Sequence, residues 1–382
     1  MDNTTGEIKM SARERVLNVL SDQPVDKIPV TCFTQVGIVE AMQKVGAPWP
    51  EAHSDPNKMA VLGASLNRLV GLEAVRIPFC LTVEAEAIGC KVDMGTVNRQ
   101  PSIRAPAFES PSLAEIDMGF LDKGRIPVVL EAIRILKKEN IDAPLIVGIT
   151  GPFTLSGHLV ETERLVKMMR TKPTEVESLL DKVTDASIAY VEKIAEAGAD
   201  VITVNEPSAA PELIDPLSFR STIKSRLQYL ARNIKTKKVL HICGASLPIV
   251  GDMAECGFDA ISIEDKVDIA KAKDVIKGGA GTKPAGGFRT GGGFGGGFGG
   301  GFGGGFGGPR LGAGEPAKAV KIAGNVSTAK TLFTGKPEEV KAEALSALRA
   351  GTDLLAPACG IAPGSPLANI KALVEARDEF QK

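Results

Sequence analysis

Eight short apolar runs, separated by longer segments of helical periodicity, constrain the fold of this 382-residue chain more than any other feature. Each run is rich in Val and Ile and ends in Gly, Pro or a polar residue, which is typical of buried parallel strands. The intervening segments are amphipathic, and in residues 173–200 Val176, Leu179 and Val183 recur at helical spacing. The eight runs cover residues 27–33, 74–80, 144–150, 200–206, 238–244, 259–265, 320–326 and 353–359.

Eight strands that alternate with helices predict an α/β protein, a single (β/α)8 TIM barrel over residues 1–382. A doubly wound open sheet is the alternative. No GxGxxG or GxxxxGK[ST] motif follows an early run, which weakens the nucleotide-binding forms of that open sheet. The connection over residues 81–123 is long, so we expect extra elements or a lid over the barrel mouth there.

Residues 278–314 interrupt this pattern, because Phe recurs at every fourth position from Phe294 to Phe306 in a background of glycine. Such a segment loses much conformational entropy on ordering and has little apolar surface to bury, so we predict a disordered insertion. It precedes the seventh run, which places it on the N-terminal face of a barrel, away from an active site. We interpret it as a tolerated expansion of a surface loop, with a Phe/Gly contact module as the alternative.

Charge and cysteine usage narrow the class of protein. The formal net charge is −1, so no basic field points to nucleic acid or to an anionic membrane as a partner. The N-terminus lacks the pattern of a secretory signal, and the apolar runs are too short for a transmembrane helix. The six cysteines are scattered, unlike those of a disulfide-stapled secreted domain. We therefore expect a cytoplasmic protein with reduced cysteines.

A candidate metal site follows from the fifth run, which ends in VLHICGAS. His241 and Cys243 point to the same side of that strand, near its C-terminal end, where catalytic groups of a barrel collect. Cys359 ends the eighth run, at a similar level along the barrel axis, and Glu264 lies near the end of the sixth run. Two thiolates, one imidazole and a replaceable oxygen or water fit a catalytic zinc ion. The alternative is that these cysteines are small buried fillers, because an isolated His-x-Cys is a weak motif.

Three further residues are candidates for the site. Glu206, at the end of the fourth run, is a possible proton acceptor or a helix cap. Asn325, at the end of the seventh run, is a candidate for binding substrate or cofactor. Arg99, in NRQPS, offers a cation to an anionic group, although a surface salt bridge is the alternative.

Several motifs resemble the uroporphyrinogen decarboxylase-like superfamily and, within it, the methylcobamide:coenzyme M methyltransferases of methanogenic archaea. Among these methyltransferases, the motifs resemble those of the methanol-pathway isozyme more than those of the methylamine-pathway isozyme. LHICG together with LAPACGIAP is specific, because the decarboxylases proper lack this set of zinc ligands and use a tyrosine in the cleft. The other matching stretches include RERVLNVLSDQPVDKIPV, GLEAVRIPFCLTVEAEAIGC, MGTVNRQPS, DMAECGFDAISIED and GNVS.

The resemblance implies an enzyme with a barrel fold and a zinc ion held by His241, Cys243 and Cys359. It also implies the thiol coenzyme M (2-mercaptoethanesulfonate) as substrate and a methylated corrinoid protein as methyl donor. Glu264 resembles the acidic position that follows the His-x-Cys strand in related zinc thiol methyltransferases, which suggests a fourth ligand when substrate is absent. The alternatives are a decarboxylase of tetrapyrrole side chains, a methyltransferase acting on another thiol, and a non-enzymatic protein with structural zinc.

Overall fold

The computed structural model describes residues 9–279 and 319–381, which contain two sheets. Seven strands form a parallel sheet in the order β1-β4-β5-β6-β7-β8-β9, and β2 pairs with β3 in an antiparallel hairpin. The strands are β1 (Val75–Ile77), β2 (Lys91–Asp93), β3 (Ser102–Ala105), β4 (Leu145–Thr150), β5 (Val201–Asn205), β6 (Lys237–His241), β7 (Ala260–Ser262), β8 (Lys321–Val326) and β9 (Leu354–Pro357).

Residues around Val30 close the parallel sheet into a barrel. Val30 forms a parallel bridge with Leu355 of β9, and the amide of Thr31 donates to the Leu355 carbonyl at 2.9 Å. On the other side, the amide of Glu73 donates to the Val30 carbonyl at 2.8 Å, next to β1. The predicted run 27–33 therefore occupies the eighth position of the barrel. The barrel prediction is confirmed, and the open sheet is excluded.

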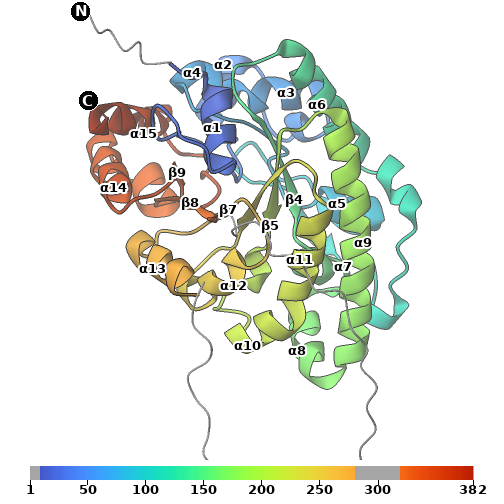
Figure 1. Cartoon of the computed structure of the whole chain (residues 1–382). Helices are drawn as coiled ribbons and strands as arrows, with labels where there is room; N and C mark the ends of the chain where they lie inside the picture. Colours follow the sequence, from blue (N-terminus) through green and yellow to red (C-terminus); the bar gives the residue numbers. More distant parts are fainter. Residues whose placement is uncertain (1–8, 280–318, 382) are drawn as a thin grey trace, which may run out of the picture.

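Helices surround this sheet, with the long α9 along one flank and α14 and α15 along another (Figure 1). The predicted helix over residues 173–200 is α9, which ends at Ala197. The next residue, Gly198, has a left-handed backbone conformation, which favours glycine. The α-helices are α1 (Ala12–Leu20), α2 (Val39–Val45), α3 (Pro56–Gly63), α4 (Ser65–Val70), α5 (Val83–Ile88), α6 (Ile126–Glu139), α7 (Pro152–Val160), α8 (Thr162–Thr171), α9 (Pro173–Ala197), α10 (Pro216–Ser218), α11 (Lys224–Asn233), α12 (Val250–Ala254), α13 (Ile269–Gly279), α14 (Pro337–Arg349) and α15 (Leu367–Phe380). Short 3₁₀ and π turns add η1 (Glu51–His53), η2 (Pro111–Leu113), η3 (Met118–Asp122), η4 (Pro207–Ala209), η5 (Phe219–Ile223), η6 (Leu247–Ile249) and η7 (Thr328–Phe333).

A small apolar core fills the N-terminal end of the barrel. Helix α1 contributes Val16, Val19 and Leu20, which pack against one apolar residue from each of several strands. The strand residues of this core are Ile146, Val201, Val239, Ala260, Ala323 and Leu354. A second and larger core lies between the strands and the surrounding helices. The N-terminal end of the barrel is therefore closed by apolar packing.

Polar side chains replace this core toward the C-terminal end of the barrel. Because side chains alternate along a strand, positions two or four residues after the inner apolar residues also face the interior. These positions hold Asn205 in β5, His241 in β6, Ser262 in β7 and Asn325 in β8. The inward-facing strand positions are therefore apolar at the N-terminal end of the barrel and polar at the C-terminal end, where active sites of such barrels lie.

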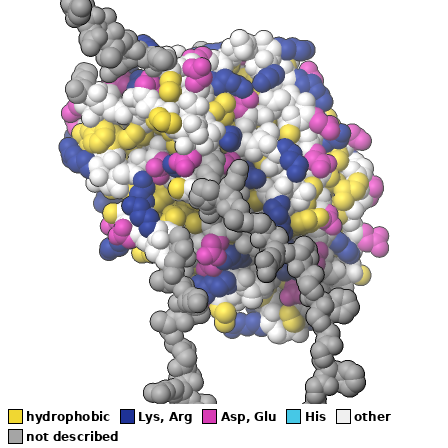
Figure 2. Space-filling model, viewed as in Figure 1, with side chains coloured by type: hydrophobic (Ala, Val, Ile, Leu, Met, Phe, Trp, Pro, Cys, Tyr) yellow, Lys and Arg dark blue, Asp and Glu magenta, His cyan; other side chains and the backbone are white. Residues whose placement is uncertain are grey.

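The long connection over residues 81–123 contains α5, the β2–β3 hairpin, η2 and η3, as expected of a segment with extra elements. The Gly/Phe-rich segment 278–314 lies outside the described residues, apart from the last two residues of α13. Within residues 9–279 and 319–381, no helix has the length and apolar character needed to cross a membrane. On the face drawn in Figure 2, positive and negative side chains of the described residues are interspersed, consistent with the net charge of −1.

Candidate metal centre and its pocket

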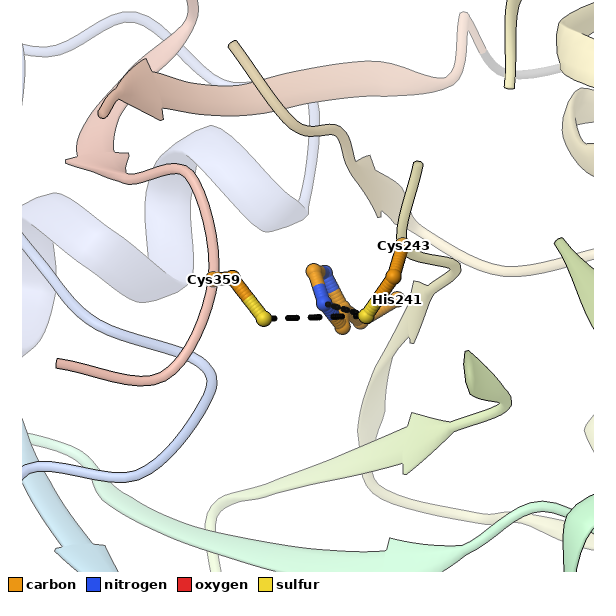
Figure 3. Close-up of side chains that lie close together, drawn as sticks. All are labelled: His241, Cys243 and Cys359. Atoms are coloured by element: carbon orange, nitrogen blue, oxygen red, sulfur yellow. Dashed lines mark hydrogen bonds between the residues drawn. The ribbon is translucent and has the colours of Figure 1, made fainter. Parts of the chain in front are cut away.

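The candidate metal site is built where β6 and β9 end. His241 is the last residue of β6, Cys243 follows two positions later, and Cys359 lies two positions beyond β9. His241 Nε2 lies 3.2 Å from Cys243 Sγ, which lies 3.6 Å from Cys359 Sγ. The three side chains point toward one another from two separate segments (Figure 3), and their ligand atoms all lie within 4.8 Å of one another.

Two of the three separations between the donor atoms are near those around a zinc ion, and the third, between His241 and Cys359, is within 4.8 Å. A tetrahedral ion at about 2.3 Å from sulfur and about 2.0 Å from nitrogen separates two sulfurs by about 3.8 Å, and sulfur from nitrogen by about 3.5 Å. The observed separations of 3.6 and 3.2 Å are close to these values. A hydrogen bond of 3.1 Å between His241 Nδ1 and the hydroxyl of Ser262 leaves Nε2 directed at the cysteines. Such a bond fixes the ring of a metal-binding histidine.

The two thiols differ in acidity because they are adjacent. The hydrogen bond from Cys243 lowers the pKa of Cys359 to about 4, although burial acts in the opposite direction. The same hydrogen bond, together with burial, raises the pKa of Cys243 far above its ordinary value. The hydrogen bond between them thus favours ionisation of Cys359 and protonation of Cys243. A cation bound between them would favour ionisation of both.

Glu264 lies beside these cysteines, two positions beyond β7. Burial raises the pKa of its carboxyl group, and the charge of Cys359 acts in the same direction. Its carboxylate also interacts with Cys243, yet it is not part of the group whose ligand atoms lie within 4.8 Å. The role of Glu264 as a fourth ligand therefore stays a prediction.

The three ligands line a pocket of about 260 Å³ at the C-terminal end of the barrel. Arg76 from β1 and Asn205 from β5 line it as well, and Gln100 contributes from the segment between β2 and β3. Part of the long connection 81–123 therefore borders the barrel mouth, as predicted. The other lining residues are Thr34, Gln35, Phe79, Cys80, Leu81, Pro207 and Gly360.

Comparison with known protein families decides where this barrel belongs. The family model described as Uroporphyrinogen decarboxylase (URO-D) matches residues 11–380, nearly the whole chain. The chain belongs to the URO-D family.

Within the URO-D family, the chain is similar to methyltransferases. It is 43% identical over 375 residues to the methylcobamide:CoM methyltransferase MtaA of Methanosarcina barkeri, which covers 97% of this chain and 99% of that protein. It is 32% identical to the methylcobamide:CoM methyltransferase MtbA of Methanosarcina acetivorans, with 97% and 98% covered. The solved structure of a methyltransferase from Methanosarcina mazei has a TM-score of 0.85 at 43% identity, with 98% of this chain and 100% of that chain covered. The predicted resemblance, and with it an enzyme of the methyltransferase class, is confirmed.

Glu206 of this URO-D family member turns toward a helix. The residue is completely buried, and its carboxylate accepts hydrogen bonds from the backbone amides of Phe153 at 3.0 Å and Thr154 at 2.5 Å, in the first turn of α7. Burial raises the pKa of Glu206 to about 7. Glu206 is not among the residues that line the described pocket. The observed contacts are those of the helix-capping alternative, and a role as proton acceptor stays a prediction.

The structure does not bring Asn325 and Arg99 together with His241, Cys243 and Cys359. The amide nitrogen of Asn325 donates to the backbone carbonyls of Glu264 at 2.9 Å and Val267 at 2.7 Å, so it fastens the loop that carries Glu264. Arg99 is exposed and pairs with Asp93 at 2.9 Å, which is the surface salt bridge of the alternative interpretation. Neither lines the pocket of the three ligands. Their roles in binding stay predictions.

Two residues at the site were not singled out from the sequence. Ser262 is paired with His241 in the ladder between β6 and β7, so its hydroxyl lies beside the imidazole. Arg76 is a charged residue in the middle of the apolar run AVRIPFC. A charge within a strand that is otherwise apolar could have marked it as a candidate site residue. Sequence alone does not give the register between strands, and so could not have paired Ser262 with His241.

Proposed function

We propose that this protein is a zinc-dependent methyltransferase that moves a methyl group from a methylated corrinoid protein to the thiol of coenzyme M. The observation that carries the proposal is the cluster of His241, Cys243 and Cys359, whose ligand atoms lie within 4.8 Å at one side of a pocket. Three protein donors leave room for a fourth, exchangeable ligand, as in catalytic zinc sites. The methylcobamide:CoM methyltransferases among the relatives support the choice of donor and acceptor.

Zinc held by these three side chains would bind the thiol of the substrate and favour its ionisation at neutral pH, because the thiolate is the nucleophile. In the transfer itself, the thiolate sulfur attacks the methyl carbon and the carbon–cobalt bond breaks. The electron pair stays on cobalt, which changes from Co(III) to Co(I), and the products are methyl-coenzyme M and the Co(I) corrinoid. The pocket walls orient the thiol toward the mouth, where the large corrinoid protein docks.

The protein's own residues prepare this step. Ser262 holds the His241 ring, and Glu264, which interacts with Cys243, would compete with substrate as a fourth ligand of zinc. We assign to Glu206 the acceptance of the thiol proton, for which the raised pKa of about 7 is suitable. That assignment requires its carboxylate to communicate with the pocket through water or a small movement, since its present partners are amides of α7.

The methanol pathway is the proposed source of the methyl group. Identity is 43% with the MtaA relative and 32% with the MtbA relative, which supports the isozyme that the sequence motifs resemble most. We place the reaction in the cytoplasm, in agreement with six cysteines that are all free of disulfide bonds. Comparing turnover with the methylated corrinoid proteins of the methanol and methylamine pathways tests this choice, and preference for the methylamine protein would contradict it.

The primary experiment measures the loss of methylcobalamin absorbance when coenzyme M is added to zinc-loaded protein. We expect thiol-dependent demethylation by the wild type and a loss of at least about 10³-fold in Cys243→Ala, because a ligand of the metal is removed. Cys256→Ala, at a buried cysteine whose thiol donates to the Asp252 carbonyl at 3.2 Å, is the matched control. Full turnover by metal-free Cys243→Ala would contradict the proposal.

A further inference from the structure

Arg76 differs from the other buried arginines of the described chain. Arg15, Arg76, Arg125 and Arg377 are all at most 4% exposed. Three of them pair with carboxylates, since Arg15 and Arg377 bind Glu73 and Arg125 binds Glu86. Arg76 forms no ion pair with any described carboxylate, its Nη1 has no hydrogen-bond partner, and its Nε reaches the Phe33 carbonyl only at 3.4 Å.

The anionic groups nearest to Arg76 are engaged elsewhere. Cys32, Cys80 and Glu84 act on its charge. Burial raises the pKa of the Cys32 thiol, which favours its neutral form, and that thiol lies 3.5 Å from the Thr34 hydroxyl. The Cys80 sulfur accepts hydrogen bonds from Arg125 at 3.3 Å and from Thr82 at 3.4 Å. The Glu84 carboxylate accepts from the amide of Thr150 at 2.7 Å and from its hydroxyl at 3.1 Å. An unpaired buried cation is costly, so a protein that keeps one has a use for an anionic ligand there.

The barrel places this guanidinium in the pocket of the metal ligands. Arg76 is the central residue of β1, and it lines the same pocket as His241, Cys243 and Cys359. Gly148 in β4 makes room for it, because a Cβ at that position would overlap the guanidinium and approach Asn205 Nδ2 at 3.1 Å. Among the residues that line this pocket, Arg76 is the only Lys or Arg.

We infer that Arg76 binds the sulfonate of a short thiol substrate, at the end of the molecule opposite its sulfur. This inference rests on the proposed function, because it takes the thiol end to lie at the metal ligands. A sulfonate is anionic at every physiological pH and presents several oxygens to the planar fork of a guanidinium. Arg76 thereby selects thiols with a fixed negative charge over neutral thiols of similar length.

The test separates anion binding from methyl transfer by using ethanesulfonate, which has no thiol, as the probe. Its binding to the full-length protein is measured by saturation-transfer NMR titration, and its inhibition of coenzyme M turnover is measured in parallel. Arg76→Met should weaken both by about 10- to 100-fold, the range for a lost charge-assisted interaction. Arg134→Met is the matched control, since Arg134 is exposed on α6 and pairs with Glu131. Arg99→Met tests the other candidate for binding the anion. If Arg99→Met lost ethanesulfonate binding and Arg76→Met kept it, the inference would be overturned.

Turnover with two thiols provides the second readout. In Arg76→Met, kcat/KM for coenzyme M should fall by about 10- to 100-fold, mainly through KM, while kcat/KM for neutral 2-mercaptoethanol stays within about threefold. Zinc content should be unchanged. Equal losses for both thiols would overturn the role of Arg76 while leaving methyl transfer intact. A different result is that ethanesulfonate binding depends on Arg76 while zinc-loaded wild type shows no thiol-dependent demethylation. That result would support the anion site and overturn the proposed function.

Folding of the variants is controlled independently. Replacing an unpaired buried cation by an apolar side chain of similar length is not expected to lower thermal stability. Arg76→Lys keeps the positive charge but lacks the paired N–H donors of the guanidinium. We therefore expect its affinity for ethanesulfonate to lie between the affinities of the wild type and Arg76→Met. Affinity in Arg76→Lys as low as in Arg76→Met, with the fold intact, would show that geometry rather than charge alone binds the anion. Unchanged affinity in both variants would overturn the inference.

Discussion

The chemistry of this site depends on single side chains that are far apart in the sequence. Cys243 and Cys359 are 116 positions apart in the sequence, yet their sulfurs lie 3.6 Å apart. Because of this contact, the pKa of Cys359 is lowered and that of Cys243 is raised. Residues outside the cluster of His241, Cys243 and Cys359 matter as well. Ser262 orients His241, and buried carboxyl groups such as Glu84 have pKa values that burial raises.

Ser262→Ala should weaken zinc binding by about 10- to 100-fold, because the His241 ring loses the hydrogen bond that holds it toward the cysteines. Competition with a chelator of known zinc affinity measures the change. Ser225→Ala, at an exposed position of α11, is the control and should bind zinc as the wild type does. Equal affinities in the wild type and Ser262→Ala would show that packing alone orients the ring.

Glu84 should make the folded state less stable as pH rises. Burial raises its pKa from 4.5 to about 7, so the unfolded chain ionises first between these pH values. Its contribution to stability is fully present below about pH 4.5 and is lost as pH rises through about 7. The full loss is up to about 3 kcal/mol, at 1.36 kcal/mol per pKa unit.

Glu84→Gln should therefore flatten the fall in the free energy of unfolding between pH 5 and pH 8, measured by urea denaturation. The fall should not vanish, because burial also raises the pKa of Glu206 to about 7 and that group remains. Parallel stability curves for variant and wild type would contradict the assigned pKa of Glu84.

At the scale of elements, helix α7 shows how a strand end and the next helix are joined. The chain leaves β4 at Thr150 and enters α7 at Pro152, while Glu206 arrives from the end of the neighbouring strand β5 to bind the first amides of the helix. Gly151 permits this approach, since a Cβ there would overlap the Glu206 carboxylate. The carboxylate also complements the positive end of the helix dipole.

Glu206→Ala should lower the free energy of unfolding by about 1–3 kcal/mol, because the buried amides of Phe153 and Thr154 lose their acceptor. Asp55→Ala, at the partly exposed cap of α3, is the comparison and should cost about 1 kcal/mol. Urea denaturation measures both.

Glu206→Gln separates the cap from the proposed proton acceptor. It retains one hydrogen-bond acceptor, so stability should fall less than in Glu206→Ala. If Glu206 accepts the thiol proton, turnover of the Gln variant falls and its pH profile changes. Full activity at all pH values would exclude that role and leave the cap alone.

At the scale of the whole molecule, the apolar core that stabilises the barrel and the pocket of the candidate site lie at opposite ends of the barrel axis. Apolar residues and α1 close the N-terminal end, and the pocket opens at the C-terminal end. The segment between Gly279 of α13 and Lys321 of β8 joins a helix to the start of a strand, and so connects at the N-terminal face. Additions at that face are far from the pocket.

Replacing residues 280–318 with a short Gly-Ser linker should therefore leave kcat and KM for coenzyme M within about twofold of the wild type. The reason is that the flanking Gly279 and Lys321 lie where a helix ends and a strand begins, at the face opposite the site. Steady-state kinetics and zinc content are the measurements. A loss of turnover in a folded, zinc-loaded variant would instead support the Phe/Gly contact module.

The sequence by itself determined the positions of the seven parallel strands and of the bridged segment at Val30, and the alignment of His241 with Cys243, because burial and side-chain alternation repeat at short, fixed periods along the chain. It also gave Cys359 as their partner, through strand-end position and family motifs. Only the tertiary structure decided that Ser262 contacts His241, that Glu206 caps α7 and that Arg76 is unpaired in the pocket. Those contacts depend on register between strands and on closure of the barrel around Val30, and no periodicity within one segment encodes either.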